Sequence, residues 1–139
     1  MVGKAKKIKE KIWLDDEEKF DRLVSLLKLE IDRILFDVEF RKDMLFRLWS
    51  KERTREPLLR ALHSRFFDLN FDSLMLLPTP LLKEVDSFYR TLDELIFYVS
   101  YTEDMPHTMK TNFDMHIKEL KTKSKEVMAK LNTYIPIGV

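Results

Sequence analysis

Cysteine is absent from this 139-residue chain. Its absence excludes disulfide bonds, thiolate nucleophiles and cysteine metal sites together. Small secreted domains commonly depend on disulfides, so the composition favours a cytoplasmic protein. The opening residues, MVGKAKKIKEKIW, lack the apolar run of a secretion signal. No later segment is apolar over the length that a bilayer requires, so the sequence predicts no membrane span.

Glycine is almost absent too, because the sequence has only Gly3 and Gly138, both near its ends. Glycine supplies the positive-φ positions of tight hairpins and of phosphate-binding loops. Glycine-rich nucleotide-binding motifs are therefore excluded, and a turn-rich β fold is not expected.

An excess of charge of one sign is also lacking, because 25 basic side chains balance 24 acidic ones and leave a net charge of +1. No overall field draws the protein to nucleic acid or to a membrane surface. With 45% apolar and 35% charged residues, the chain should form a packed core under a solvated surface. We expect a basic N-terminal tail over residues 1–14, one helical-bundle domain over 15–134, and a C-terminal tail over 135–139.

Helical periodicity is the strongest pattern that the sequence does contain. It predicts helices over residues 15–50, from 54 to between 70 and 77, over 79–101 and over 106–134. In the first helix, steps of four and three connect the expected core positions, with only Arg41 out of type: Phe20, Val24, Leu27, Ile31, Ile34, Val38, Leu45 and Leu48. Short connections favour antiparallel neighbours, so the pattern predicts an all-α, up-down-up-down antiparallel four-helix bundle with a long first helix. The stretch LNFDSLMLL, residues 69–77, allows a short extra helix between the second and third.

His63 lies in an aromatic-rich part of the predicted second helix, at the boundary of its apolar face. The motif RALHS, residues 60–64, resembles the histidine phosphotransfer domain, a helical bundle whose exposed histidine accepts and passes on a phosphoryl group. The resemblance implies His63 as the acceptor and Arg60 as the neighbouring cation. In that family a lysine and a glycine typically follow the histidine by three and four positions, where this chain has Phe66 and Phe67. The favoured interpretation of His63 is a histidine that borders the core.

His116 falls on the apolar side of the predicted fourth helix and should point into the bundle, with a carbonyl or Ser124 as its hydrogen-bond partner. A metal, haem or small-molecule site in the bundle is the alternative, although the paired Glu-x-x-His motif of di-iron bundles is missing. No nucleophile, base and oxyanion hole can be assembled from the pattern. We therefore expect no metal, no cofactor and no enzyme.

Leu29, Phe36 and Phe40 form a second apolar set on the first helix, nearly opposite its core positions. Monomers rarely leave a contiguous apolar patch in water, so an interface is favoured, either in a homodimer through paired first helices or with another protein. Internal cover by residues 12–14 or by residues 134–139 is the alternative.

Two further groups of side chains are candidates for a surface: an aromatic group at the end of the third predicted helix and a basic group on the fourth. For Phe97, Tyr98 and Tyr101, at the end of the third predicted helix, closing the end of the bundle is somewhat favoured over forming an interface. Lys118, Lys121 and Lys125 form a basic ridge on the fourth helix, for which a solvated surface is favoured over RNA or ribosome binding, because no arginine or aromatic side chain is interleaved. The sequence as a whole predicts an adaptor, regulatory or assembly subunit that acts by binding a protein partner or itself.

Overall fold

A computed structural model describes the backbone of residues 2–134 and the side chains of residues 16–134, and every regular element in this range is a helix. The all-α prediction is therefore confirmed. The long helices are α1 (Val2–Phe40), α5 (Thr79–Tyr101) and α6 (Pro106–Leu131), and the short ones are α2 (Lys42–Ser50), α3 (Glu56–Leu62), the 3₁₀ turn η1 (Arg65–Asp68) and α4 (Phe71–Leu74). The C-terminal tail predicted for residues 135–139 lies outside the described residues.

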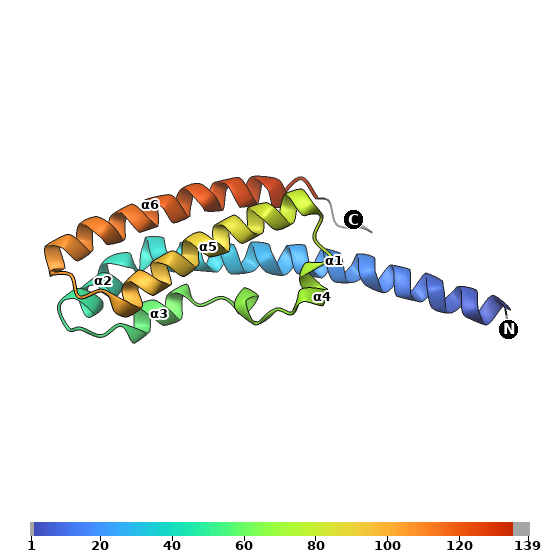
Figure 1. Ribbon diagram of the computed structural model, residues 1–139, viewed down its shortest axis with the longest axis horizontal. Helices are drawn as coiled ribbons and strands as arrows, with labels where there is room; N and C mark the ends of the chain where they lie inside the picture. Colours follow the sequence, from blue (N-terminus) through green and yellow to red (C-terminus); the bar gives the residue numbers. More distant parts are fainter. Residues whose placement is uncertain (1, 135–139) are drawn as a thin grey trace.

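The three long helices run side by side along the molecule (Figure 1). Helices α5 and α6 form an antiparallel hairpin and share the most extensive pairing in the described chain. Helices α2 and α3 lie at the end where this hairpin turns, and the N-terminal part of α1 extends beyond the other helices at the opposite end. Both α5 and α6 begin at residues that the sequence predicts, since Pro80 and Pro106 occupy the first turns, where a missing amide costs little.

The core lies where α1, α5 and α6 meet. Its central residues are at most 3% exposed: Leu27, Ile31 and Ile34 of α1, Phe88, Leu92 and Leu95 of α5, and Phe113, Ile117 and Leu120 of α6. Each such side chain stabilises the fold by about 1.5–3 kcal/mol relative to exposure. The three residues of α1 are among the core positions that the periodicity of the sequence predicted.

The predicted first helix differs from the structure in its bounds and its continuity, because α1 begins at Val2 and the helix bends at Arg41. Arg41 has φ −114° and ψ 3°, and its side chain stays in solvent, 3.8 Å from the carboxylate of Asp37. Arg41 was the charged residue at a predicted core position, and burying an unpaired charge is costly. Beyond the bend the core residues of α2 are Leu45 and, four positions later, Trp49, whereas Leu48, a predicted core residue, is only partly buried.

The predicted second helix is wrong as a continuous element, because α3 ends at Leu62 and the chain continues through η1 and α4. The hydroxyl of Ser64 accepts a hydrogen bond from the Phe66 amide at 3.2 Å and starts η1. The side chain of Asn70 accepts one from the Ser73 amide at 2.9 Å and starts α4, the short extra helix that the sequence allowed. Such capping residues compete with helix continuation, and here they prevail over the apolar spacing.

A buried carboxylate fixes this broken segment to α1. Glu30 is 4% exposed and accepts hydrogen bonds from the Ser64 hydroxyl at 3.1 Å, the Arg65 amide at 3.0 Å and the Arg65 guanidinium at 2.9 Å. Burial raises the pKa of Glu30, but these hydrogen bonds and the nearby Arg33 outweigh it and hold the pKa below 4.5. Ser64 also hydrogen-bonds to the Tyr89 hydroxyl at 3.0 Å, which joins α1, the broken segment and α5 in one cluster.

Candidate protein-binding surface

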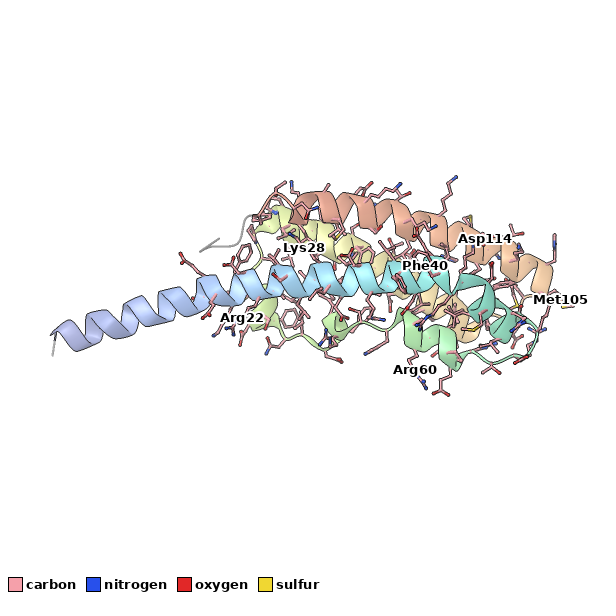
Figure 2. The ribbon with its side chains drawn as sticks, turned by 180° about the vertical axis from the view of Figure 1, so that it is seen from behind. Arg22, Lys28, Phe40, Arg60, Met105 and Asp114 are labelled. Carbon is pink, nitrogen blue, oxygen red and sulfur yellow. The ribbon has the colours of Figure 1, made fainter. Side chains whose placement is uncertain are left out.

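The outer side of α1 carries the three apolar residues that the sequence predicts as an interface. Leu29, Phe36 and Phe40 are 65%, 54% and 73% exposed, and the rings of Phe36 and Phe40 pack together with their centroids 4.7 Å apart. Figure 2 shows α1 running across the front of the molecule with no other helix in front of it. These residues therefore form an open apolar surface, hereafter the α1 outer face.

The two edges of α1 beside this face are used inside the molecule. On one edge, Arg33 donates to the carbonyl oxygens of Ala61 and His63 and so binds the end of α3. On the other edge, Glu39 pairs with Lys121 of α6 at 3.4 Å. Because both edges contact neighbours and the core covers the inner side, the outer face is the side of α1 left for a partner.

Internal cover of the outer face finds no support in the described residues. Residues 12–14 belong to the same continuous α1 helix and precede the face along it, so they cannot fold back as a separate segment. The other candidate cover, the C-terminal tail, lies outside the described residues beyond Tyr134. Tyr134 itself packs edge-on against Phe20, with ring centroids 5.7 Å apart.

His63 does not lie within a helix, so its predicted place on the apolar boundary of a second helix is wrong. It follows the last residue of α3 in an extended conformation, with its side chain 60% exposed and Nε2 3.9 Å from a carboxylate oxygen of Asp68. Arg60 pairs with Glu56 one turn earlier on α3. The two residues of the phosphotransfer interpretation are thus exposed, and each has a carboxylate neighbour.

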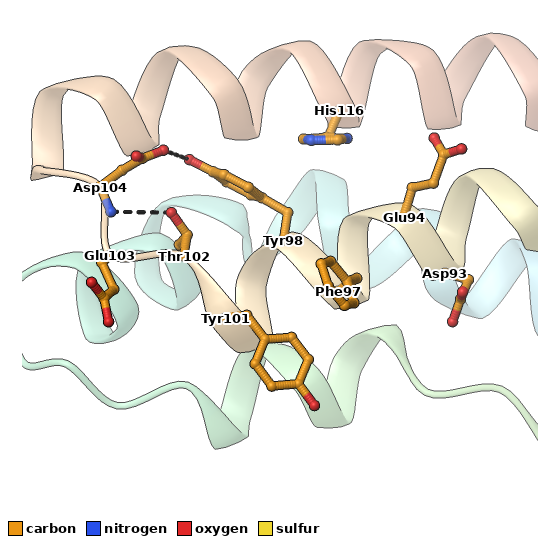
Figure 3. A pocket seen from close by; sticks show the side chains of 9 residues that line it. All are labelled: Asp93, Glu94, Phe97, Tyr98, Tyr101, Thr102, Glu103, Asp104 and His116. Carbon is orange, nitrogen blue, oxygen red and sulfur yellow. Dashed lines mark hydrogen bonds between the residues drawn. The ribbon is translucent and has the colours of Figure 1, made fainter.

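An open groove of about 810 Å³ lies between the end of α5 and α6, and no pattern in the sequence predicted it (Figure 3). Its lining combines acidic and aromatic side chains: Asp93, Glu94, Glu103, Asp104, Phe97, Tyr98 and Tyr101. The Tyr98 hydroxyl donates to Asp104 at 2.8 Å, a hydrogen bond that lowers the pKa of Asp104. Burial raises the pKa of Tyr98, and its hydrogen bond to Asp104 raises it further.

The aromatic residues of this groove do not close the bundle as predicted. Phe97 and Tyr101 are 66% and 69% exposed, and only Tyr98 reaches inward, where it packs edge-on against Trp49. His116 also lines the groove and lies against the Tyr98 ring, with centroids 5.1 Å apart, so the prediction that it points into the core is wrong. Ser124 donates to the Lys121 carbonyl and is not its partner.

The charge of the predicted basic ridge is partly neutralised by an acidic residue of α1. Lys118 and Lys125 are exposed, but Lys121 is half-buried and pairs with Glu39 of α1. A ridge whose middle lysine bridges two helices offers phosphates less free charge than the sequence implies. The lysine side chains of the N-terminal tail lie outside the described residues.

In comparisons with known proteins, no protein-family model, curated protein or solved structure matches the chain. Across residues 16–134, no group of three or more His, Cys, Asp or Glu side chains could hold a metal ion. In the same part of the chain, no helix has the length and apolar character needed to cross a membrane.

Proposed function

We propose that this chain is a small cytoplasmic helical-bundle protein that acts by binding a protein, as an adaptor, regulatory or assembly subunit, and not by catalysis. The contact surface in this proposal is the α1 outer face. The proposal also treats the chain as a variant up-down-up-down bundle in which residues 56–77 take the place of the second helix. The single observation that carries it is the pair of packed, exposed rings of Phe36 and Phe40.

The exposed area of the outer face supports a binding role. Two aromatic side chains and a leucine remain in water on a helix whose opposite side is fully buried, and contiguous apolar surface in water is unfavourable by about 25 cal/mol per Å². Aromatic residues are enriched at the centres of protein interfaces, where they contribute most of the binding energy. A partner that covers Phe36 and Phe40 would recover that energy.

Phe40→Asp tests this proposal, because Phe40 is the most exposed of the three residues and contributes little to the core. Helicity and melting temperature should stay near wild type, since surface substitutions usually change stability by no more than about 0.5 kcal/mol. Association with a partner, measured by capture on immobilised protein together with light scattering, should be lost. A large fall in stability would place Phe40 in the folding core and contradict the proposal.

Phe97→Asp is the matched control, because Phe97 has similar exposure on a different helix. It also tests a second candidate, in which the groove beside Phe97 and Tyr101 binds a cationic group through its carboxylates and aromatic faces. Association lost with Phe97→Asp but retained with Phe40→Asp would move the function to that groove.

The phosphotransfer alternative rests on His63 and Arg60, and the geometry gives it little support. Asp68 stands 3.9 Å from the imidazole, where its negative charge opposes an incoming phosphoryl group. Acid-labile phosphate on the wild type but not on His63→Gln, after incubation with a phosphorylated response regulator, would restore this alternative.

A further inference from the structure

A set of exposed residues continues the outer face along α1 and, beyond the bend at Arg41, along α2. Within each of the two helices they follow one another at steps of three or four, which keeps them on one side of that helix. We call this set the α1 stripe: Glu18, Arg22, Ser25, Leu29, Asp32, Phe36, Phe40 and, beyond the bend, Asp43 and Arg47. The apolar residues occupy its middle and opposite charges occupy its ends.

When two copies of the stripe are placed antiparallel, acidic residues at the end of one copy meet basic residues at the end of the other. From one end the stripe reads acid then base, Glu18 and Arg22, and from the other end it reads base then acid, Arg47 and Asp43. We infer that the partner of the α1 outer face is a second copy of this chain, docked antiparallel about a two-fold axis near Asp32. The inference rests on the proposed function, because it names the partner for the same surface.

In this arrangement a residue of one copy faces the residue of the second copy that lies at the same distance from the two-fold axis but on the opposite side of Asp32. Glu18 then faces Arg47 of the second copy, and Arg22 faces Asp43. A parallel dimer would instead place each of these charges against its own like charge, which is unfavourable. Charge complementarity therefore selects the antiparallel arrangement and its register.

The same register places the apolar residues together. Leu29 faces Phe36 of the second copy, and Phe40 lies over the small side chain of Ser25. At the axis the two Asp32 side chains approach one another, so the register includes one like-charge approach. Asp32→Asn removes that repulsion and should tighten association severalfold.

The area is sufficient for a reversible dimer. Taking about 200 Å² for each aromatic side chain, the exposed parts of Phe36 and Phe40 together with Leu29 amount to roughly 350 Å² per copy. The two copies would then bury roughly 700 Å² of apolar surface, which corresponds to a total interface of about 1,200 Å², the lower end for stable complexes. Because the interface is small, we expect weak association, with a dissociation constant on the order of micromolar.

Exchanging the charges of one pair tests the register directly. In a homodimer of Arg22→Asp, the introduced carboxylate of each copy faces Asp43 of the other copy, and in a homodimer of Asp43→Arg two arginines face one another. Each variant alone should dissociate about ten-fold more readily than wild type at low ionic strength. An equal mixture of the two variants can also form a heterodimer, which contains one copy of Arg22→Asp and one copy of Asp43→Arg. In the antiparallel dimer its facing charges are therefore opposite, as in wild type. A parallel in-register dimer of the two variants would also bring opposite charges together, but there neither variant alone would be weaker than wild type, because like charges already face one another in the wild type. Weakening of each variant alone together with recovery in the mixture therefore identifies the antiparallel register.

The heterodimer contains two such contacts. One joins the introduced carboxylate at position 22 to the introduced arginine at position 43, and the other joins the unaltered Arg22 to the unaltered Asp43. Both are opposite in charge, so a heterodimer of near wild-type affinity should form.

The two positions are roughly 30 Å apart along one chain, so recovery in the mixture cannot come from a contact within a chain. The Arg22 side chain is 78% exposed and Asp43 is exposed, so both variants should fold, which circular dichroism and melting check. Sedimentation velocity of each protein and of the mixture gives the dissociation constants. Weaker association of each variant alone, together with recovery in the mixture, supports the inference.

Three other results would overturn it in different ways. A wild-type dimer whose mixed variants do not recover has another register or surface. A wild type that is monomeric at about 100 μM, well above the micromolar constant expected here, but loses a captured protein on Phe40→Asp, leaves the proposed function standing and refutes the second copy as partner. A monomer whose captured proteins do not change with Phe40→Asp refutes both.

Discussion

Glu30→Ala should destabilise the fold more than any other single loss of charge in α1, because Glu30 holds the broken segment between α3 and α5. Alanine leaves the Arg65 amide without its charged acceptor, a loss of about 1.5–3 kcal/mol. The Arg65 guanidinium is 67% exposed, so its ion pair adds at most about 1 kcal/mol. Ser64 keeps Tyr89 as a partner, and relief of carboxylate burial offsets part of the loss. We expect a net destabilisation of about 2–3 kcal/mol.

Urea denaturation at neutral pH, followed by circular dichroism, measures this change. With a slope typical of small proteins, the midpoint should fall by about 1–2 M. Glu39→Ala is the control, because Glu39 is half exposed, pairs with Lys121 at 3.4 Å and should lose less than about 1 kcal/mol. Equal effects of the two substitutions would contradict the role assigned to Glu30.

The pH dependence of Glu30→Gln provides a second check on the same cluster. Because the folded state holds the pKa of Glu30 below its ordinary 4.5, the carboxylate stabilises the fold fully above that pH. This contribution is lost as the pH falls through the folded pKa. The stability difference between wild type and Glu30→Gln should therefore be constant near neutral pH and shrink in acid, and a difference that grows in acid would refute the assignment.

Two further predictions concern other contacts of the same fold. Arg55→Ala should destabilise the protein by about 1–3 kcal/mol in urea denaturation, because the Arg55 guanidinium donates to the carbonyls of Ser100 and Thr102 at the end of α5; an unchanged midpoint would mean that water replaces it. Burial raises the pKa of Tyr89 to about 12, so ultraviolet titration of Tyr89→Phe should show one late-ionising tyrosine fewer than the wild type, in which the pKa of Tyr98 is raised as well. Stability should fall between about pH 10 and 12, where Tyr89 is ionised only in the unfolded state. A normal titration of Tyr89 would refute its burial.

Local patterning located α1, α5 and α6 because each presents apolar residues at helical spacing to one core. Pro80 and Pro106 mark helix starts by their own chemistry, whatever surrounds them. The apolar set on the α1 outer face was visible in the same way, because helical angle alone places Phe36 and Phe40 opposite Ile31 and Ile34. These features depend on neighbours within a few turns of one helix.

In residues 56–77, local apolar spacing does not predict the structure. The spacing predicts one helix, and Ser64 and Asn70 are the capping signals that a closer reading of the sequence could have used. Even then, the pairing of Ser64 with Glu30 joins residues 34 positions apart. The energy that favours the broken segment over a helix comes from a buried acceptor on another helix, which local spacing does not contain.

The candidate surfaces also separate into features that local spacing predicts and features that depend on tertiary contacts. The sequence by itself determined an all-helical chain and an apolar set on the first helix, because both follow from the 3.6-residue period of the α-helix. Only the tertiary structure decided that this set stays in solvent, that His63 lies beyond the end of α3, and that acidic and aromatic residues of α5 form a groove with His116 of α6. Exposure, helix ends and grooves depend on which elements pack against one another, and that depends on contacts between residues far apart in the chain.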